Sequence, residues 1–413
     1  MINIIFILLF LISNLWELFL NNLNLKHAIH KGKEIPEIFK DTLQEETVEK
    51  SLNYLKDKVK LSNIETITKT IFVSFGLIYL FPLFEKISIK IINYLGFKNY
   101  TFYQSIIFFV FLGLFIFFID LPFDIIFTFK IEKKYGFSNI TKKLYIVDKI
   151  KIIILSLIIG LPLIYGLINF ILNYKLFFIP LSLIIIGIIF LINIIYPWLI
   201  LPLFYKFEKL ENDDLKNKIF NILEKVKLKF ENIYVMNASS RSTHTNAFFS
   251  GIGKTKKIVF YDTLIKNHSQ DEILSIFAHE LGHYKKGHIF KSFILSSIFI
   301  ITILFLFNIL INTKISEVFY SCKICIDLKI IYTGVFLSSI LFPIEFLINS
   351  ICRKFEFESD EFAAKLTDKD SMILSLKRIF KDNLSNLFPH PLYSKFKYTH
   401  PPPIERIEHL MKL

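Results

Sequence analysis

Long apolar blocks dominate the pattern of hydrophobic and polar positions along the chain. A helix of about 20 apolar residues spans the hydrocarbon core of a bilayer. Seven blocks approach or exceed that length, at residues 2–20, 66–84, 102–121, 150–172, 176–200, 289–312 and 328–350. The first block lacks the basic start and small-residue cleavage site of a secretory signal peptide, so we expect it to remain as an anchor. The pattern predicts a polytopic membrane protein with about seven spanning helices.

The polar stretch between the fifth and sixth blocks has apolar residues at the short, regular spacings of helices and strands. Residues 211–230 place apolar side chains at helical spacing, as a surface helix does. Strand-like runs follow at 233–236, 246–249 and 257–261. This stretch is therefore predicted to form a small α+β unit outside the bilayer.

A further helix is predicted to begin at Ser269. Its hydroxyl would cap the first turn, and Glu272 three residues later would complete a capping box. Apolar residues recur at helical spacing after this start, so we expect the helix to continue through Gly287 into the sixth block.

Composition supports the membrane assignment, and the charge distribution gives a topology. The chain has 413 residues, of which 53% are hydrophobic, and its net charge is +13. The lysines concentrate in the loops at 21–65 and 122–149, and few occur in the loops of the opposite side. By the positive-inside rule the richer side is cytoplasmic, together with 201–288 and the C-terminal tail. The basic excess thus reflects topology, and we expect no nucleic-acid partner.

We expect four segments along the chain. Residues 1–200 form an N-terminal membrane region with five spans, and 201–288 form a cytosolic segment. Spans six and seven occupy 289–350, and 351–413 return to the cytosol.

Cys322 and Cys325 form a CxxC pair in the outer loop between spans six and seven. No thioredoxin-like context or second ligand pair accompanies them. We therefore favour a structural disulfide or idle thiols over a redox or metal site.

His279, Glu280 and His283 form an HExxH motif directly ahead of the sixth block. Residues four apart share one face of a helix, so the two imidazoles can bind one metal ion. Glu280 then lies beside the metal as a candidate general base. The motif points to a metalloprotease.

A catalytic zinc takes a third protein ligand, which must come from the same side of the membrane. Span six crosses the membrane outward and span seven crosses it back, so the chain after residue 350 is again cytoplasmic. There either Glu356 or Glu358 could ligate, and Asp360 shares a helical face with Glu356. One carboxylate of that pair could bind metal while the other orients a ligand histidine.

Together these motifs resemble the integral-membrane zinc proteases of the CAAX prenyl protease type 1 family, which are gluzincins. The similar segments cover roughly residues 100–410 and are weaker before that. They are Leu121-Pro122 with 130–137, Tyr196-Pro197 with 202–207, 239–247, the HExxH, 355–360, 390–393, and 400–402 with Glu405-Arg406.

The resemblance implies one zinc ion per chain, held by His279, His283 and Glu356. It also implies Glu280 as the general base and Asp360 as the partner of a ligand histidine.

Further residues receive roles from the same resemblance. His400 would donate to the oxyanion at the scissile carbonyl. Asn246 and Ala247 would lie on an edge strand that pairs with an extended substrate. Arg406 would structure that corner, or pair with substrate or acidic residues.

Four other polar residues lie in or near these segments. We assign no direct chemistry to His244, His288 or His390. Arg241 is equally compatible with a structural ion pair and with a substrate carboxylate.

The implied fold is mainly α: about seven transmembrane helices enclosing a chamber, and a cytoplasmic gluzincin-type cap with a small β-sheet. Lipid-facing carboxylates are costly, so ionisable residues at membrane depth suit an interior wall. These are Glu17, Asp120, Asp124 and Glu345.

The predicted function is peptide-bond hydrolysis by a membrane-embedded zinc metalloendopeptidase, with CAAX processing of prenylated proteins as the implied reaction. The alternatives are a general quality-control protease of the membrane and a non-catalytic metal-binding membrane protein. An intramembrane-cleaving protease is disfavoured, because charged residues surround this HExxH. The expected partners are protein or peptide substrates and the bilayer, which is a bacterial inner membrane or the endoplasmic reticulum. The oligomeric state is left open.

Overall fold

The computed structural model describes residues 4–96, 100–228, 233–250, 257–312 and 325–413. Six helical stretches within them are long and apolar enough to cross a membrane. A seventh crossing is available to α14 (Ile326–Leu341) and α15 (Ile344–Leu366), which meet at a bend of 59°. The expectation of about seven spans is therefore confirmed.

The six stretches contain the long helices α1 (Ile4–Lys31), α2 (Glu45–Phe75) with α3 (Phe81–Leu95), α4 (Tyr100–Ile126), α6 (Lys142–Asn173), α7 (Phe178–Ile195) and α12 (His288–Asn312). Several helices continue well beyond the apolar blocks. The region 21–65, expected as a loop, is largely the end of α1 and the start of α2.

Proline residues shape two of the spans. A π-helical turn at Gly76–Leu80 joins α2 to α3 just before Pro82, and another at Tyr196–Ile200 contains Pro197. Proline has no N–H to donate to the preceding turn, and a wider turn accommodates its ring. The chain stays helical across these positions, so that α7 continues into the short α8 (Leu201–Phe204). A third π turn, Phe127–Ile131, joins α4 to α5 (Glu132–Tyr135).

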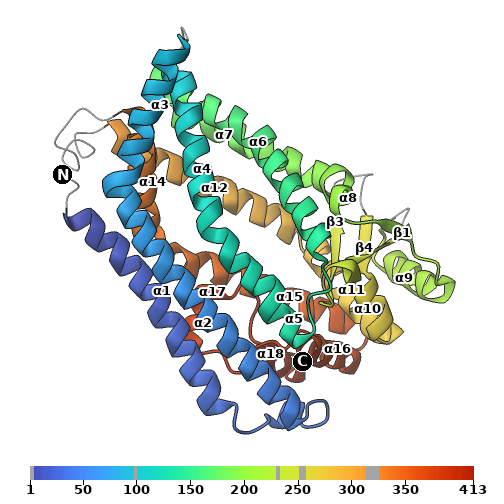
Figure 1. Ribbon diagram of the computed structural model, residues 1–413. Helices are drawn as coiled ribbons and strands as arrows, with labels where there is room; N and C mark the ends of the chain where they lie inside the picture. The colour runs from blue at the N-terminus through green and yellow to red at the C-terminus, as the bar shows by residue number, and fades with distance from the viewer. Residues whose placement is uncertain (1–3, 97–99, 229–232, 251–256, 313–324) are drawn as a thin grey trace.

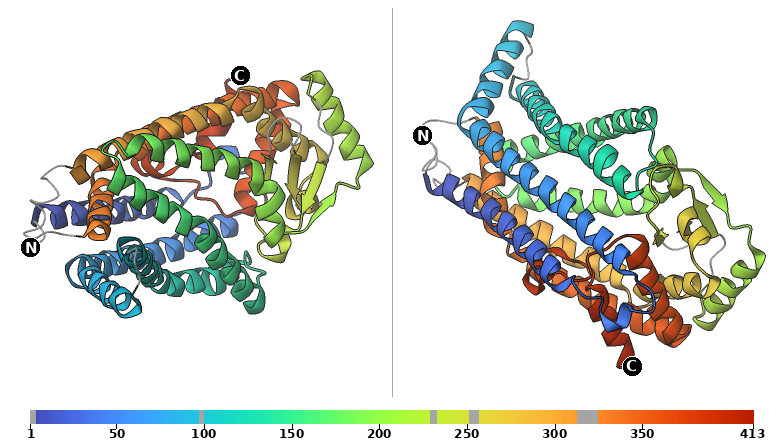
Figure 2. Two further views of the ribbon diagram at one scale, coloured as in Figure 1. Left: turned by 90° about the horizontal axis from the view of Figure 1, so that it is seen from above. Right: turned by 60° about the horizontal axis from the view of Figure 1, so that its bottom comes forward.

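Helix α14 contributes to two apolar clusters within the membrane region. Leu328 and Tyr332 pack with residues of α1, α3 and α4, whereas Ile330 and Leu337 pack with residues of α6, α7 and α12. Figures 1 and 2 show the sheet and α9 at one end of these long helices, away from the N-terminus.

The sheet has four strands in the order β1-β2-β4-β3. The strands are β1 (Phe207–Lys209), β2 (Ile233–Met236), β3 (Ala247–Ser250) and β4 (Lys257–Tyr261). β2 and β4 are parallel, the outer pairs are antiparallel, and β3 is an edge strand. The three predicted strands are confirmed to within one residue, while β1 was not predicted because three residues carry no readable alternation.

Helix α9 (Asp213–Lys225) packs against the sheet. Asn212 caps it by accepting a hydrogen bond from the Leu215 backbone N–H, so the predicted helix at 211–230 is confirmed in shorter form. Ile219 and Phe260 are fully buried where α9 meets β4. Each such side chain contributes roughly 1.5–3 kcal/mol through burial.

Helix α11 (Gln270–Lys285) follows the short α10 (Asp262–Asn267), and the predicted capping box is present. Ser269 Oγ accepts from the Glu272 backbone N–H, and the Glu272 carboxylate accepts from the Ser269 N–H. The predicted continuation into span six is wrong. Gly287 has φ +70°, a left-handed conformation that ends the helix, and α12 begins anew at His288.

The C-terminal part consists of α15, α16 (Lys369–Asp382), α17 (Pro391–Lys397) and α18 (Pro403–Met411). Helix α11 lies closely against α15. A Cβ added at Gly282 would meet the Ser359 Cα at 3.0 Å, so any larger residue would push the two helix backbones apart. The close packing brings the HExxH helix against the acidic residues of α15.

Candidate metal centre

Three donor groups from α11 and α15 converge at one point. The Nε2 atoms of His279 and His283 are 3.2 Å apart, and they lie 3.4 and 3.2 Å from the Glu356 carboxylate oxygens. All three donor atoms lie within 4.8 Å of one another. Two imidazole nitrogens and one carboxylate oxygen are the protein ligands of many catalytic zinc sites. The residues present therefore fit a divalent metal with one coordination position left open.

The structure distinguishes between the two glutamates that the sequence left open. Glu356 is buried beside the histidines, whereas the Glu358 carboxylate lies 3.0 Å from His288 Nε2. The residues are two apart on a helix and therefore point in nearly opposite directions.

Asp360 lies behind His279 and is fully buried. Its Oδ1 is 2.8 Å from His279 Nδ1, on the side of the ring away from the donor cluster. Burial lowers the pKa of His279, but the Asp360 carboxylate more than offsets this effect and raises the pKa to about 10 in the metal-free protein. A hydrogen bond from Nδ1–H to Asp360 leaves the lone pair of Nε2 directed at the donor cluster.

Arg406 forms a bidentate ion pair with Asp360, with Nε and Nη2 at 2.7 and 2.5 Å from the two oxygens. The guanidinium is buried and also lies 3.7 Å from Glu356. Among the predicted alternatives for Arg406, this geometry favours pairing with acidic residues over substrate binding.

Glu280 and His400 are less enclosed. Glu280 is half-buried next to His279, and its burial raises the pKa of the carboxyl, while the neighbouring imidazoles oppose the shift. His400 Nδ1 lies 2.7 Å from Glu356, and the side chain is 65% exposed. A half-buried carboxylate beside the donor cluster can exchange a proton with a bound water.

Asn246 and Ala247 lie at the start of the edge strand. Ala247 pairs with Phe260, the Asn246 carbonyl accepts from the Tyr261 N–H, and the Asn246 side chain accepts from the Ala247 N–H. In the described part of the sheet, β3 pairs with β4 on one side only. Its other side can therefore accept an added strand.

Arg241 and His244, which precede this strand, have protein partners. Arg241 forms a bidentate ion pair with Asp148 of α6 at 2.8 and 3.0 Å, which favours the structural alternative. His244 Nδ1 lies 2.8 Å from Asn383 and Nε2 lies 3.2 Å from Glu132. Asp148, Glu132 and Asn383 were not identified from the sequence, because nothing local marks them as partners of a distant segment.

His288 and His390 also have protein neighbours. His390 caps α17 by accepting from the Leu392 N–H, and His288 lies between His283 and Glu358. Of the CxxC pair, Cys325 is half-buried and Cys322 lies outside the described residues.

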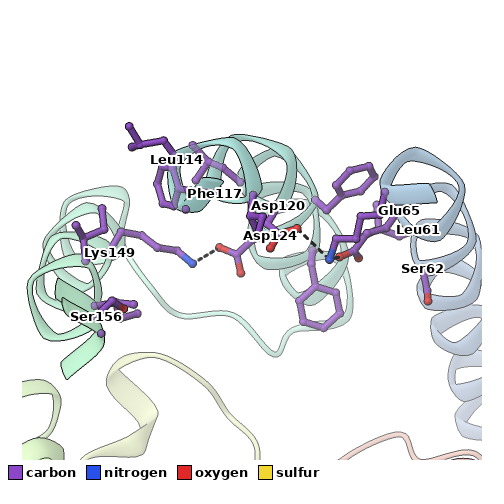
Figure 3. A pocket seen from close by; sticks show the side chains of 18 of the residues that line it. Leu61, Ser62, Glu65, Leu114, Phe117, Asp120, Asp124, Lys149 and Ser156 are labelled. Carbon is purple, nitrogen blue, oxygen red and sulfur yellow. Dashed lines mark ion pairs between the residues drawn. The ribbon is translucent and has the colours of Figure 1, made fainter. Parts of the chain in front are cut away.

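A cavity of about 1090 Å³ lies among the spanning helices, lined mainly by residues of α2, α4 and α6 (Figure 3). Its lining includes two ion-paired aspartates: Asp120 lies 2.9 Å from Lys69, and Asp124 lies 2.7 Å from Lys149. Apolar side chains of α4 and α6 form much of the remaining wall, among them Phe109, Leu114, Phe117, Ile153, Leu157 and Leu161. The cavity is therefore amphipathic.

The four ionisable residues expected at membrane depth all have charged partners. Asp120 and Asp124 line the cavity, as expected for an interior wall. Glu17 and Glu345 both pair with Lys397, at 2.6 and 3.0 Å.

Comparisons with known families match nearly the whole chain. Residues 209–413 match peptidase family M48, and residues 24–206 match the family described as CAAX prenyl protease N-terminal, five membrane helices.

Several named proteins are similar over most of their length. The chain is 32% identical to the CAAX prenyl protease 1 homolog of Dictyostelium discoideum, over 99% of this chain and 96% of that protein. It is 31% identical to CAAX prenyl protease 1 of Saccharomyces cerevisiae, over 91% of this chain and 88% of that protein. The human CAAX prenyl protease 1 homolog is also 31% identical, over 96% of this chain and 92% of that protein.

The fold is similar to the crystal structure of S. mikatae Ste24p. The TM-score is 0.89 at 28% sequence identity, and the match covers 99% of this chain and all of that one.

Proposed function

The chain belongs to peptidase family M48 as a multi-pass membrane metalloprotease, and from this premise we propose that it cleaves prenylated proteins at their C-terminal CAAX sequence. The observation that carries the proposal is the convergence of His279, His283 and Glu356 with Glu280 beside them. We further propose that 201–288 and 351–413 together form the catalytic cap.

The proposed metal is one zinc ion, because a two-histidine, one-glutamate donor set is typical of zinc hydrolases. Zinc bound there would polarise the scissile carbonyl and lower the pKa of a water molecule. Glu280 would accept a proton from the attacking water and return it to the departing amine. His400, the most exposed of these groups, would donate a hydrogen bond to the carbonyl oxygen as negative charge develops there.

Asp360 would hold His279 in the tautomer whose Nε2 lone pair faces the metal, and Arg406 would hold Asp360. The substrate would bind in extended form along the free side of β3, where Asn246 and Ala247 begin the edge strand.

Two observations support a lipidated substrate. The named relatives are prenyl proteases, and the amphipathic cavity offers apolar wall for a hydrocarbon chain together with charged groups for a peptide. The lysine distribution supports a cytoplasmic active site, and the eukaryotic relatives favour the endoplasmic reticulum over a bacterial membrane.

The test compares a farnesylated CAAX peptide with its unprenylated counterpart, using purified protein reconstituted in lipid. We expect faster cleavage of the farnesylated peptide, loss of activity on chelation and recovery with zinc. Glu280→Gln should retain zinc and lose about a hundred- to ten-thousand-fold in rate, the usual range for a general base. Equal cleavage of both peptides would instead assign the protein to general membrane proteolysis, and undiminished cleavage by Glu280→Gln would refute the assignment of the base.

A further inference from the structure

The ring of His283 has a second neighbour on the side away from the donor cluster. His283 Nε2 faces Glu356 and His279, while its Nδ1 lies 3.2 Å from Nδ1 of His288. On its other edge, His288 Nε2 lies 3.0 Å from Glu358 Oε2. The three side chains form a continuous row that leads from the donor cluster to a carboxylate.

We propose that His288 and Glu358 are positioning residues that hold His283 in its metal-binding tautomer, an inference that rests on the proposed metal site. A metal on His283 Nε2 requires that this nitrogen carry no proton, so the ring proton is on Nδ1. His283 Nδ1–H then donates to His288 Nδ1, and His288 Nε2–H donates to Glu358. The hydrogen bond from His288 to Glu358 fixes the tautomer of His288, and the acceptor nitrogen of His288 then fixes the tautomer of His283.

Local packing holds His288 in this place. Its side chain is 2% exposed, and its ring stacks on Phe355 with centroids 4.3 Å apart and planes at 10°. Ser359 Oγ also lies 3.4 Å from His288 Nδ1. Phe355, Glu358 and Ser359 belong to α15, the helix that supplies the third donor.

The break at Gly287 is what brings His288 to His283. On a continuous helix, residues five apart are separated by about 140° around the axis, so their side chains point away from each other. The left-handed conformation of Gly287 ends α11 and starts α12 in a new direction, and the two rings meet with centroids 5.2 Å apart.

Helix α15 thus serves both ligand histidines. Asp360 contacts His279 directly, whereas Glu358 reaches His283 through His288. Glu356 provides the metal donor between them. Outer partners of metal-ligating histidines orient the ring and raise its basicity, and their removal typically lowers metal affinity 10- to 100-fold.

The deciding measurement is the zinc affinity of the full-length purified protein, by competition with a chelator of known affinity. His288→Phe keeps a ring to stack on Phe355 and removes the acceptor, so we expect zinc to bind about 10- to 100-fold more weakly. His288→Asn places an acceptor near the former Nδ1 and should recover part of the loss. The absorption spectrum of the cobalt-substituted protein should change in His288→Phe, which reports directly on ligand geometry.

The chain offers a matched control in a second histidine–glutamate pair. His409 Nε2 lies 2.9 Å from Glu361 of α15, and the His409 ring lies 4.8 Å from Phe357. Since this pair contacts none of the three metal-donor residues, His409→Phe should leave zinc affinity and the cobalt spectrum unchanged.

Wild-type zinc affinity in a folded His288→Phe variant would overturn the inference. If that variant fails to fold, Glu358→Ala decides: zinc binding weakened several-fold supports the positioning role, and wild-type affinity overturns it. A wild-type protein that binds no zinc would instead refute the proposed metal site. Zinc binding without CAAX cleavage would refute only the proposed substrate.

Discussion

Asp360 is fully buried and holds two partners, the His279 imidazole and the Arg406 guanidinium. Its oxygens lie 2.8 Å from His279 and 2.5 and 2.7 Å from Arg406. Removing one member of a buried ion pair leaves the other charge uncompensated, at a cost of about 3–5 kcal/mol. We therefore expect Asp360→Ala to lower the unfolding temperature and to weaken zinc binding, since His279 also loses its orienting partner.

Thermal unfolding and zinc competition, each on the purified protein, check this expectation. Asp370→Ala, at an exposed carboxylate in the first turn of α16, is the control. It should leave zinc affinity unchanged and cost no more than about 0.3–1 kcal/mol, the contribution of an acidic residue at a helix N-terminus. An Asp360→Ala protein with wild-type stability would show that Arg406 finds another partner or reaches solvent.

His268 predicts a pH dependence of stability. Its side chain is fully buried, and neither ring nitrogen has a hydrogen-bond partner. Burial lowers the pKa of His268 below its usual 6.5, so the unfolded chain binds a proton that the folded protein resists. The stability associated with a neutral His268 is thus fully present above pH 6.5 and is lost as the pH falls through that value.

The variant His268→Leu should be close to neutral at pH 8. It replaces a neutral ring that has no hydrogen bond, and whose neighbour Asp382 lies 3.9 Å away, with an apolar side chain. Between pH 8 and pH 5.5 the unfolding temperature of the wild type should fall further than that of the variant. Parallel curves for the two proteins would rule out His268 as a source of the acid sensitivity.

Sequence spacing could identify His279, Glu280 and His283, because four residues return a helix to the same face. It could not choose between Glu356 and Glu358, because that choice depends on which face of α15 meets α11. In the structure Gly282 of α11 lies against Ser359 of α15, and this contact fixes which face of α15 meets the HExxH helix. The contact between His283 and His288 was not predicted because a continuous helix was expected, although a glycine after two lysines is a recognisable helix end.

The contact between α11 and α15 brings together the proposed metal ligands from two distant parts of the sequence. Gly282 permits this contact, since a Cβ there would lie 3.0 Å from the Ser359 Cα and 3.2 Å from its carbonyl oxygen. Backbone atoms cannot move aside as a flexible side chain can. Gly282→Val should therefore separate the helices, cost about 1–3 kcal/mol through overpacking, and weaken zinc binding.

Gly334→Ala in α14 provides the comparison, because no atom lies within 4 Å of the position of its added Cβ. Alanine has the higher helix propensity, so this variant should be neutral or slightly more stable. Zinc titration together with thermal unfolding distinguishes the two variants. Wild-type zinc affinity in Gly282→Val would mean that the donor geometry does not depend on this contact.

Whether a segment forms a helix or a strand could be predicted more readily than where that element begins and ends. Apolar blocks mark where a helix crosses the hydrocarbon core, but α1 and α2 continue for several turns through charged sequence. This region is stabilised by burial against the C-terminal part: Phe39, between the two helices, and Val48 of α2 pack with Met372 and Ile407. Such contacts join segments more than 300 residues apart, and no local pattern encodes them.

Ion pairs between residues far apart in the sequence link the membrane helices to the end of the molecule that carries the HExxH helix. Arg241, just before the edge strand, pairs with Asp148 of α6, and Glu132 of α5 contacts both Tyr54 and His244. The segment that begins β3 is therefore fixed by helices that also line the cavity or adjoin it. This arrangement ties the proposed substrate strand to the cavity wall.

The cavity makes a prediction about substrate selection. Gly113 of α4 and Gly160 of α6 both line it, and no atom lies within 4 Å of a Cβ added at either position. Gly160→Phe would therefore place a large side chain in open space rather than in packed structure. If the prenyl chain occupies this apolar part, KM for a farnesylated CAAX peptide should rise about tenfold, equivalent to about 1.4 kcal/mol of lost binding.

The unprenylated peptide gives the internal control, because it has no chain to displace and its KM should stay unchanged. Gly187→Phe in α7 gives the external control. That position is equally open to an added Cβ but lies on an exposed face that does not line the cavity. A tenfold effect on both peptides would indicate a general disturbance of the active site. No effect on either peptide would place the prenyl chain elsewhere, in a second cavity or in the surrounding bilayer. Only a loss confined to the farnesylated peptide, seen in Gly160→Phe and absent from Gly187→Phe, makes the cavity between α4 and α6 part of the substrate site.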